Sequence, residues 1–278
     1  MIQFFSASFS LLTILFFSSK RTARKVKRVK RYHEDCIVVG NGPSLAGDVE
    51  RVLSLSQKCD VICVNTIYRM DFFWQIKPSF YMFIDPALFE LTDRTKKLRE
   101  ETINAFNKID WGMTLIIPHF YRNSSVLKNI KNNNVSVLPI NTVRVNYGSE
   151  RFRHFFYDKQ LGMPKAQTVL NGAIYLAIFW RYHNIYLFGA DHSWLKDVYV
   201  DDENYVLFVQ RHAFDKGNNV QVTRSSNNTL ARLLRAWANM FESHMLNQEY
   251  AKKRNVNVFN CTKGSYIDAY PRLSIEIE

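Results

Sequence analysis

The stretch CIVVGNGPSLAGDV, residues 36–49, decides the fold class of this chain. Four apolar residues, Cys36 to Val39, run directly into a Gly-Asn-Gly-Pro-Ser turn, and an amphipathic pattern follows from Leu45. A short continuous apolar run is typical of a strand that is buried on both faces, and glycine lets a backbone approach a neighbour closely. We therefore expect a parallel sheet whose first strand ends in a binding loop.

The alternation of apolar strands and helices continues along the chain. Strands are expected at 60–65, 79–85, 114–118, 135–140, 184–191 and 256–262, and helices at 45–57, 95–109, 167–182 and 229–254. Strands separated by helices form parallel sheets with helices on both faces. The sequence thus predicts an α/β, Rossmann-like fold, and such sheets bind ligands at the carboxyl ends of their strands.

Composition narrows the classes of function. With 278 residues and 47% hydrophobic content, the chain can bury a large core without staples. Its four cysteines lack the spacing of a zinc site and are too few for a disulfide scaffold. The net charge is +12, but eight basic residues lie between Lys20 and Arg31, and about +4 remains without them. The charge is therefore confined to one segment, which argues against a nucleic-acid partner.

An apolar segment, residues 2–19, precedes this basic run. Positive charge after an apolar segment tends to stay in the cytosol, and lysine and arginine beside a membrane bind anionic lipid. We expect residues 1–31 to form a membrane anchor or interfacial helix, and residues 32–278 to form one catalytic domain on the cytoplasmic side. The alternative is that residues 1–31 are a disordered basic tail.

Polar residues, glycines and one proline stand at the ends of five expected strands. They are Asn41, Gly42, Pro43, Ser44, Asn65, Asp85, Gly189, Asp191, His192, Ser193 and Asn260. Each could be a turn residue, although Thr66 and Ile67 after Asn65 are not typical of a turn. The Gly-Asn-Gly-Pro-Ser turn is neither a Walker A loop nor a complete Rossmann fingerprint. Because it precedes a helix, we expect the amides of Ser44 and Leu45 to favour an anion.

Three blocks of sequence resemble known proteins. IVVGNGPSL (37–45), DVICVN (60–65) and LNGAIYLAIFWRYHNIYLFGADHSW (170–194) are similar to bacterial sialyltransferases of the Campylobacter type. They also resemble a wider group of surface-polysaccharide proteins and hydroxymethylpterin diphosphokinase-like proteins. The resemblance implies contacts to the nucleotide from Asn41, Gly42, Asn65 and residues 189–193, to the donor sugar from Asn171 and Gly172, and to the leaving phosphate from Tyr199.

The chain departs from the sialyltransferase pattern at three places. Ser193 stands where that family has a second phosphate tyrosine, and Asp85 stands where it has a donor-site asparagine. A carboxylate there would repel an anionic sugar, which argues against sialic acid. The family's general base is a histidine before the last long helix, and residues 220–229 contain none.

A sugar transfer needs a base for the acceptor hydroxyl proton. We expect His212, beside Arg211 and Asp215, to be this base, with His192 as the second candidate and Arg224 as a phosphate clamp.

Two functions remain open. The first is a glycosyltransferase at the cytoplasmic face of the bacterial inner membrane, which transfers a sugar from a nucleotide donor, CMP-linked by the resemblance. Its acceptor would be a lipopolysaccharide, capsule or lipid-linked precursor, and it would need no metal or other cofactor. The second is a pterin-type pyrophosphokinase that uses ATP and Mg²⁺, with Asp85 and Asp191 as the metal-binding pair. The sequence leaves homo-oligomer formation open.

Overall fold

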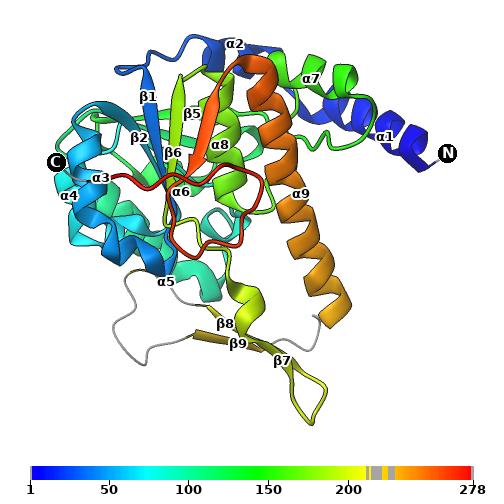
Figure 1. Ribbon diagram of the computed structural model, residues 1–278. Helices are drawn as coiled ribbons and strands as arrows, with labels where there is room; N and C mark the ends of the chain where they lie inside the picture. Colours follow the sequence, from blue (N-terminus) through cyan, green and yellow to red (C-terminus); the bar gives the residue numbers. More distant parts are fainter. Residues whose placement is uncertain (1, 211–212, 214–220, 225–228, 277–278) are drawn as a thin grey trace.

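A seven-stranded parallel sheet forms the centre of the molecule (Figure 1). The computed structural model describes residues 2–210, 213, 221–224 and 229–276. The strands lie in the order β10-β6-β1-β2-β3-β4-β5. Their bounds are β1 Asp35–Val39, β2 Cys59–Val64, β3 Phe80–Met82, β4 Met113–Pro118, β5 Val135–Ile140, β6 Asn184–Phe188 and β10 Asn257–Asn260. The predicted α/β, Rossmann-like fold is confirmed.

Helices cover both faces of the sheet. They are α1 Ile2–Phe17, α2 Lys20–Lys27, α3 Val49–Ser56, α4 Asp71–Ile76, α5 Asp93–Asn107, α6 Ser125–Asn129, α7 Glu150–Asp158, α8 Val169–Phe179 and α9 Leu230–Arg254. Cys36 and Val38 of β1 pack in a layer with α2, α8 and α9, whereas Ile37 and Val39 pack with α3, α4 and α5. This burial on both faces explains why β1 reads as a continuous apolar run.

The predicted helix over 45–57 begins differently in the structure. Residues Pro43–Gly47 form a 3₁₀ turn (η1), in which the amide of Leu45 bonds the carbonyl of Gly42 at 3.1 Å. Asp48 then has a non-helical backbone, with φ −114° and ψ 3°, and α3 starts at Val49. The tight turn after β1 therefore leaves no room for a regular first helical turn.

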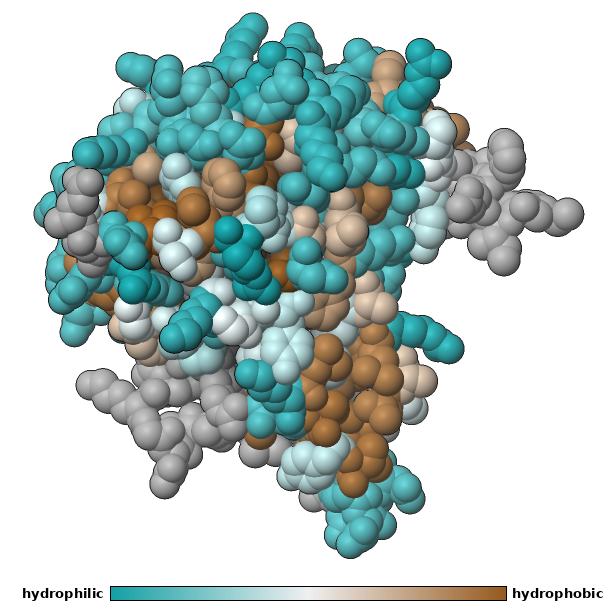
Figure 2. Space-filling model, in the orientation of Figure 1, coloured by the Kyte–Doolittle hydropathy of each residue, from teal (hydrophilic) through white to brown (hydrophobic). Residues whose placement is uncertain are grey.

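The stretch between Ser193 and α9 contains a small sheet that the sequence pattern did not reveal. It consists of β7 Val198–Val200, β8 Val206–Gln210 and β9 Gln221–Arg224, all antiparallel. Figure 2 shows apolar side chains in the lower part of the view, over this region and the first turns of α9. Exposed apolar residues there are Leu195, Val200, Leu230 and Leu234.

The basic run is folded onto the domain as α2, not as a disordered tail. Ala23 and Val26 are buried, and the carbonyl of Val26 accepts a hydrogen bond of 3.0 Å from the indole of Trp180. Just before α2, the amide of Ser19 donates to the side chain of Asn141 at 2.9 Å. The boundary expected at residue 31 therefore does not coincide with a break in packing. Among the helices that the structure describes, none combines the length and apolar character needed to cross a bilayer.

Candidate active site

A cavity of about 650 Å³ opens at the carboxyl ends of β1, β2, β3 and β6. The chain continues from β1 to β2 on one side, while β6 pairs with β1 on the other. This reversal of strand order separates the loops after β1 and β6, and open α/β sheets bind ligands at such points. The position and size of the cavity are those of a small-molecule site.

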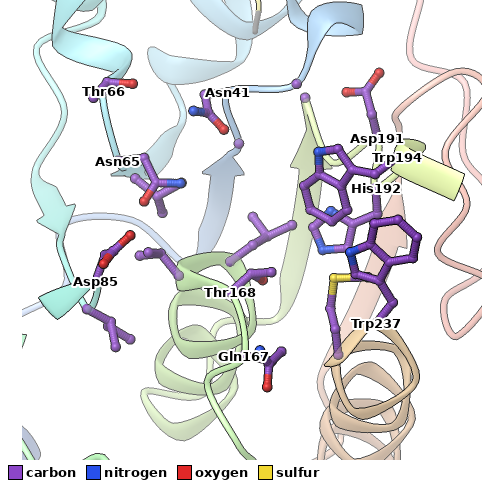
Figure 3. Close-up of a pocket in the computed structure, with 18 of the residues that line it drawn as sticks. Asn41, Asn65, Thr66, Asp85, Gln167, Thr168, Asp191, His192, Trp194 and Trp237 are labelled. Carbon is purple, nitrogen blue, oxygen red and sulfur yellow. The ribbon is translucent and has the colours of Figure 1, made fainter. Parts of the chain in front are cut away.

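The two sides of the cavity differ in chemistry (Figure 3). Amides, hydroxyls and one carboxylate form the polar side: Asn41, Asn65, Thr66, Asp85, Gln167 and Thr168. Aromatic rings form the opposite side: His192, Trp194 and Trp237. Phe208 also lines the cavity. The arrangement suits a ligand with a polyhydroxylated part and a planar ring.

Three backbone amides and a hydroxyl of the loop after β1 donate hydrogen bonds to acceptors within the protein. The amides of Gly40 and Gly42 donate to the carbonyls of Phe188 and Gly189, at 2.8 and 3.0 Å. The amide and hydroxyl of Ser44 donate to the carboxylate of Asp191, at 3.2 and 2.7 Å. Asp191 thus occupies the position at the start of η1 where an anion was expected. The expectation that the amides of Ser44 and Leu45 favour an anion is met at Ser44 by the protein's own Asp191, and the amide of Leu45 donates to the carbonyl of Gly42, so neither amide is left for a ligand.

The glycine at position 42 serves the packing between these loops. A Cβ atom on Gly42 would lie 1.9 Å from the Oδ2 atom of Asp191 and 2.7 Å from the carbonyl oxygen of Gly189. Asp191 is almost fully buried, and this burial raises the pKa of its carboxyl group. Gly42 is therefore required by the neighbouring loop, and close approach of a ligand is not needed to explain it.

Asn65 has a conformational explanation as well as a place in the cavity. Its backbone is left-handed, with φ 56°, and its carbonyl accepts a hydrogen bond of 2.8 Å from the hydroxyl of Tyr81. Asparagine tolerates this conformation better than most residues. The backbone therefore turns at Asn65, although the residues after it in the sequence are not typical of a turn. The side chain still lies on the polar side of the cavity.

His192 lies within the aromatic side and is only 7% exposed. Its ring stacks on Trp194 at a centroid distance of 4.9 Å and lies 5.1 Å from the ring of His244. Burial lowers the pKa of His192 to about 3. An imidazole with so low a pKa is a weak general base near neutral pH. The structure does not support the expectation that His192 acts as the base. Its ring instead packs against the indole of Trp194.

Other predicted site residues lie away from the cavity. Asn171 is fully buried in α8, where its side chain caps the helix and donates to the carbonyl of Met240 at 3.4 Å. A Cβ atom on Gly172 would lie 2.4 Å from Ile84, so this glycine packs in the core. Neither residue lines the cavity, so the structure does not support the contact with a donor sugar that the resemblance implied. Tyr199 lies exposed on β7, also outside the lining.

Of the remaining predicted site residues, some line the cavity and others lie outside the residues that the structure describes. Pro43, Gly189 and Ser193 line the cavity, and their contact with a nucleotide stays a prediction. Arg211, His212 and Asp215 lie outside the described residues, so the predicted base at His212 stays a prediction. Asn260 is buried beneath the site and bonds the hydroxyl of Ser265 at 3.0 Å.

The start of α8 is a part of the site that sequence reasoning missed. Gln167, Thr168, Val169 and Leu170 line the cavity. Thr168 forms a capping box with Asn171, three residues later, which fixes the start of α8 within the helix expected over 167–182. The first amides of a helix have no intrahelical acceptor. The amino end of α8 therefore offers donors to the cavity that the loop after β1 does not.

The two carboxylates considered as a metal-binding pair do not come together. Asp85 and Asp191 stand on opposite sides of the cavity in Figure 3, and Asp191 is engaged with Ser44. Asp85 is exposed, and its Oδ1 atom accepts a hydrogen bond of 2.9 Å from the amide of Ala87. In the part of the chain that the structure describes, no cluster of three or more His, Cys, Asp or Glu residues has the arrangement of a metal site.

The loops that form the cavity fall within a known family. The model of the family "6-hydroxymethylpterin diphosphokinase MptE-like" matches residues 13–197. The chain belongs to the MptE-like family. This confirms the wider group noted from the sequence, while the likeness to Campylobacter-type sialyltransferases stays a prediction. The family match includes the loops after β1, β2, β3 and β6, and ends before β8 and α9, which complete the aromatic side.

One solved structure extends the likeness over most of this MptE-like chain. It is the Maf glycosyltransferase from Magnetospirillum magneticum AMB-1, with a TM-score of 0.50 and 19% sequence identity. The match covers 92% of this chain and 37% of the Maf protein, so the chain spans little more than a third of that relative. At this identity the likeness shows the fold. No curated protein matches this chain in sequence.

Proposed function

We propose that this protein is a glycosyltransferase that takes a sugar from a nucleotide donor in the cavity between the loops after β1 and β6. The observation that carries the proposal is the division of this cavity into a polar and an aromatic side. A nucleotide sugar has the same division, with a planar base at one end and sugar hydroxyls at the other. The Maf glycosyltransferase supports the proposal through its fold.

The donor is proposed to lie across the cavity with its base at the aromatic side and its sugar at the polar side. Its base stacks on Trp194 and Trp237, because a planar ring buries apolar area well against indole. Its sugar hydroxyls meet the amides and hydroxyls of the polar side. The phosphate lies near the first turn of α8, where Val169 and Leu170 present amides and the helix dipole favours negative charge.

Asp85 is proposed to act at the sugar end. It is exposed, it lines the polar side, and one carboxylate oxygen remains beyond the bond to Ala87. A carboxylate in this position can accept the proton of an acceptor hydroxyl as the sugar is transferred. Its charge would also repel an anionic sugar, which favours a neutral or amino sugar over sialic acid. CMP-linkage of the donor and a lipid-linked or lipopolysaccharide acceptor remain expectations from the sequence resemblance.

The alternative function is a pterin-type pyrophosphokinase, and the family match favours it. Such a reaction uses ATP with Mg²⁺, and the metal needs oxygen ligands close together. Among the described residues, the separation of Asp85 and Asp191 supports the glycosyltransferase instead.

A thermal-shift screen with CMP, UDP, GDP and ATP, each with and without Mg²⁺, distinguishes these functions. A nucleotide at about 100 times its Kd stabilises the native state by roughly 2.7 kcal/mol, so binding is readily detected. We expect CMP, UDP or GDP to raise the melting temperature without Mg²⁺. Trp237→Ala should lose this shift, while Leu91→Ala, which changes an exposed side chain outside the cavity, should keep it. Stabilisation by ATP only, and only with Mg²⁺, would contradict the proposal.

The role of Asp85 has its own test. Asp85→Asn should lower turnover by about 10²- to 10⁴-fold while the nucleotide still raises the melting temperature, because a general base contacts the acceptor. Turnover close to that of the unmodified protein would show that another group takes the proton, and His212 would then be the next candidate.

A further inference from the structure

The exposed side of α1 is unusually apolar for a protein surface. Five residues of its last two turns form this side, which we call the α1 face: Leu11, Leu12, Leu15, Phe16 and Phe17. Leu15 and Phe16 are 76% and 79% exposed. Ile14, on the inner side, is buried in the core, and the hydroxyl of Ser18 bonds the carbonyl of Leu161. The helix is therefore fixed to the domain with its apolar side outward.

A second cavity, of about 550 Å³, lies where α1 ends. Phe16 and Phe17 line it together with Phe120, which is 74% exposed and lies in the turn η4 (His119–Tyr121) after β4. Two arginines, Arg122 and Arg144, also line it, and the rest of the lining is Thr13, Ser18, His119, Thr142 and Val143. The cavity thus combines an apolar wall with two guanidinium groups.

Both guanidinium groups are available to an anion. Arg122 donates to the carbonyl of His119 at 3.1 Å, and Arg144 donates to the hydroxyl of Tyr147 at 2.6 Å. Within the described residues, neither forms an ion pair with a carboxylate, and the Nε atom of Arg144 is buried without a hydrogen-bond partner. Guanidinium groups in this state are suited to bind phosphate oxygens.

Further cations lie on α2, which begins two residues after Ser18 of this cavity. The exposed ones are Lys20, Arg21, Arg24, Lys25, Lys27 and Arg28, and no described carboxylate forms an ion pair with them. Figure 2 shows a hydrophilic surface along the top of the view, where α2 lies in Figure 1. An apolar helix side next to a field of basic residues has the composition of a surface that binds anionic membranes.

We propose that the α1 face, the cavity of Arg122 and Arg144, and the cations of α2 together dock the protein on an anionic bilayer. The α1 face enters the interface between headgroups and acyl chains, and a lipid phosphate is held between the two arginines. Because Ile14 keeps the inner side of α1 against the protein, the helix lies along the membrane surface. This surface is separate from the active-site cavity, so the inference does not depend on the proposed transferase activity.

Co-sedimentation of the full chain with lipid vesicles tests the docking surface. Vesicles of phosphatidylcholine mixed with phosphatidylglycerol should bind more protein than phosphatidylcholine alone, and added salt should weaken the preference. Each basic residue near an anionic membrane contributes about fivefold to binding, so Arg122→Glu with Arg144→Glu should lower partitioning by at least roughly 25-fold. Leu15→Ser with Phe16→Ser should lower binding to both kinds of vesicle.

A matched pair controls for the change in net charge. Lys58→Glu with Lys108→Glu alters the charge equally, at exposed positions that follow α3 and α5. This pair should retain most of the binding. Equal losses in both pairs, or no preference for anionic vesicles, would overturn the proposal. So would a dimer in light scattering that Leu15→Ser with Phe16→Ser dissociates, because a second copy of the chain would then cover the α1 face.

Discussion

The buried pair His192 and His244 predicts that the protein loses stability on mild acidification. Both rings are buried, and within the described residues neither Nε2 atom has a hydrogen-bond partner. Burial lowers the pKa of His192 to about 3, and burial together with the neighbouring His192 lowers the pKa of His244 well below its usual value. An unfolded histidine has a pKa of about 6.5. Between these values only the unfolded chain takes up protons at the two positions.

The sign and size of the effect follow from proton linkage. Where the unfolded state binds more protons, the free energy of unfolding falls as the pH falls. At pH 5 an unfolded histidine is almost fully protonated, so each buried ring lowers the stability by about 2 kcal/mol relative to pH 7.5. For the pair we expect a loss of about 4 kcal/mol, which begins as the pH passes below 6.5.

Urea unfolding at a series of pH values between 7.5 and 5 measures this loss. Substitution of either histidine by glutamine should remove about half of the pH dependence that the pair contributes. Tyr270→Phe is a suitable control, because it removes the hydroxyl that lies 3.1 Å from the Nδ1 atom of His244 while both imidazoles remain. It should lower the stability at every pH and leave the pH dependence unchanged. Identical pH dependence in the two glutamine variants and the unmodified protein would refute the reasoning.

Two further predictions concern the frame of the domain. Gly42→Ala should destabilise the protein by about 1 to 3 kcal/mol in urea unfolding, because its Cβ atom would overlap the carboxylate of Asp191. Gly47→Ala is the control. Its added Cβ has no atom within 4 Å, so the stability should change by less than about 1 kcal/mol. Deletion of residues 2–31 should cost several kcal/mol, since it removes buried side chains of α2. Deletion of residues 2–17 alone should cost much less, and equal stability of the two truncated proteins would contradict the packing described for α2.

The sheet could be predicted because the apolar pattern of each strand lies within a few consecutive residues. Each central strand is buried on both faces and therefore appears as a short apolar run, as in Ile37 to Val39 and Val61 to Val64. The helix after β1 was less predictable. Its apolar spacing indicated a helix from Leu45, but the tight turn that packs against β6 imposes a 3₁₀ conformation first. The small sheet before α9 was not predicted although β8 contains an apolar run, Val206 to Val209, because the polar residues on either side favoured an irregular stretch.

The candidate site was only partly predictable, because its decisive contacts join distant parts of the chain. Polar strand ends such as Asn41 and Asp85 could be found from the sequence, and they do line the cavity. The bond between Ser44 and Asp191 joins residues 147 positions apart, and it reverses the role expected for the loop after β1. Trp237 comes from α9, beyond every motif that was recognised. Burial of His192, which removes its value as a base, likewise depends on partners that local sequence does not identify.

The carboxylate of Asp191, which follows β6, occupies the donors of Ser44 in the loop after β1 and would compete there with a ligand anion. The Gly-Asn-Gly-Pro-Ser loop has kept the backbone of an anion-binding turn, but its anion belongs to the protein and cannot diffuse away. A group held in this manner has an effective concentration on the order of millimolar or higher. A free phosphate must exceed that value to displace it. The loop after β1 therefore joins β1 to the end of β6, and ligand contacts fall to the other residues that line the cavity.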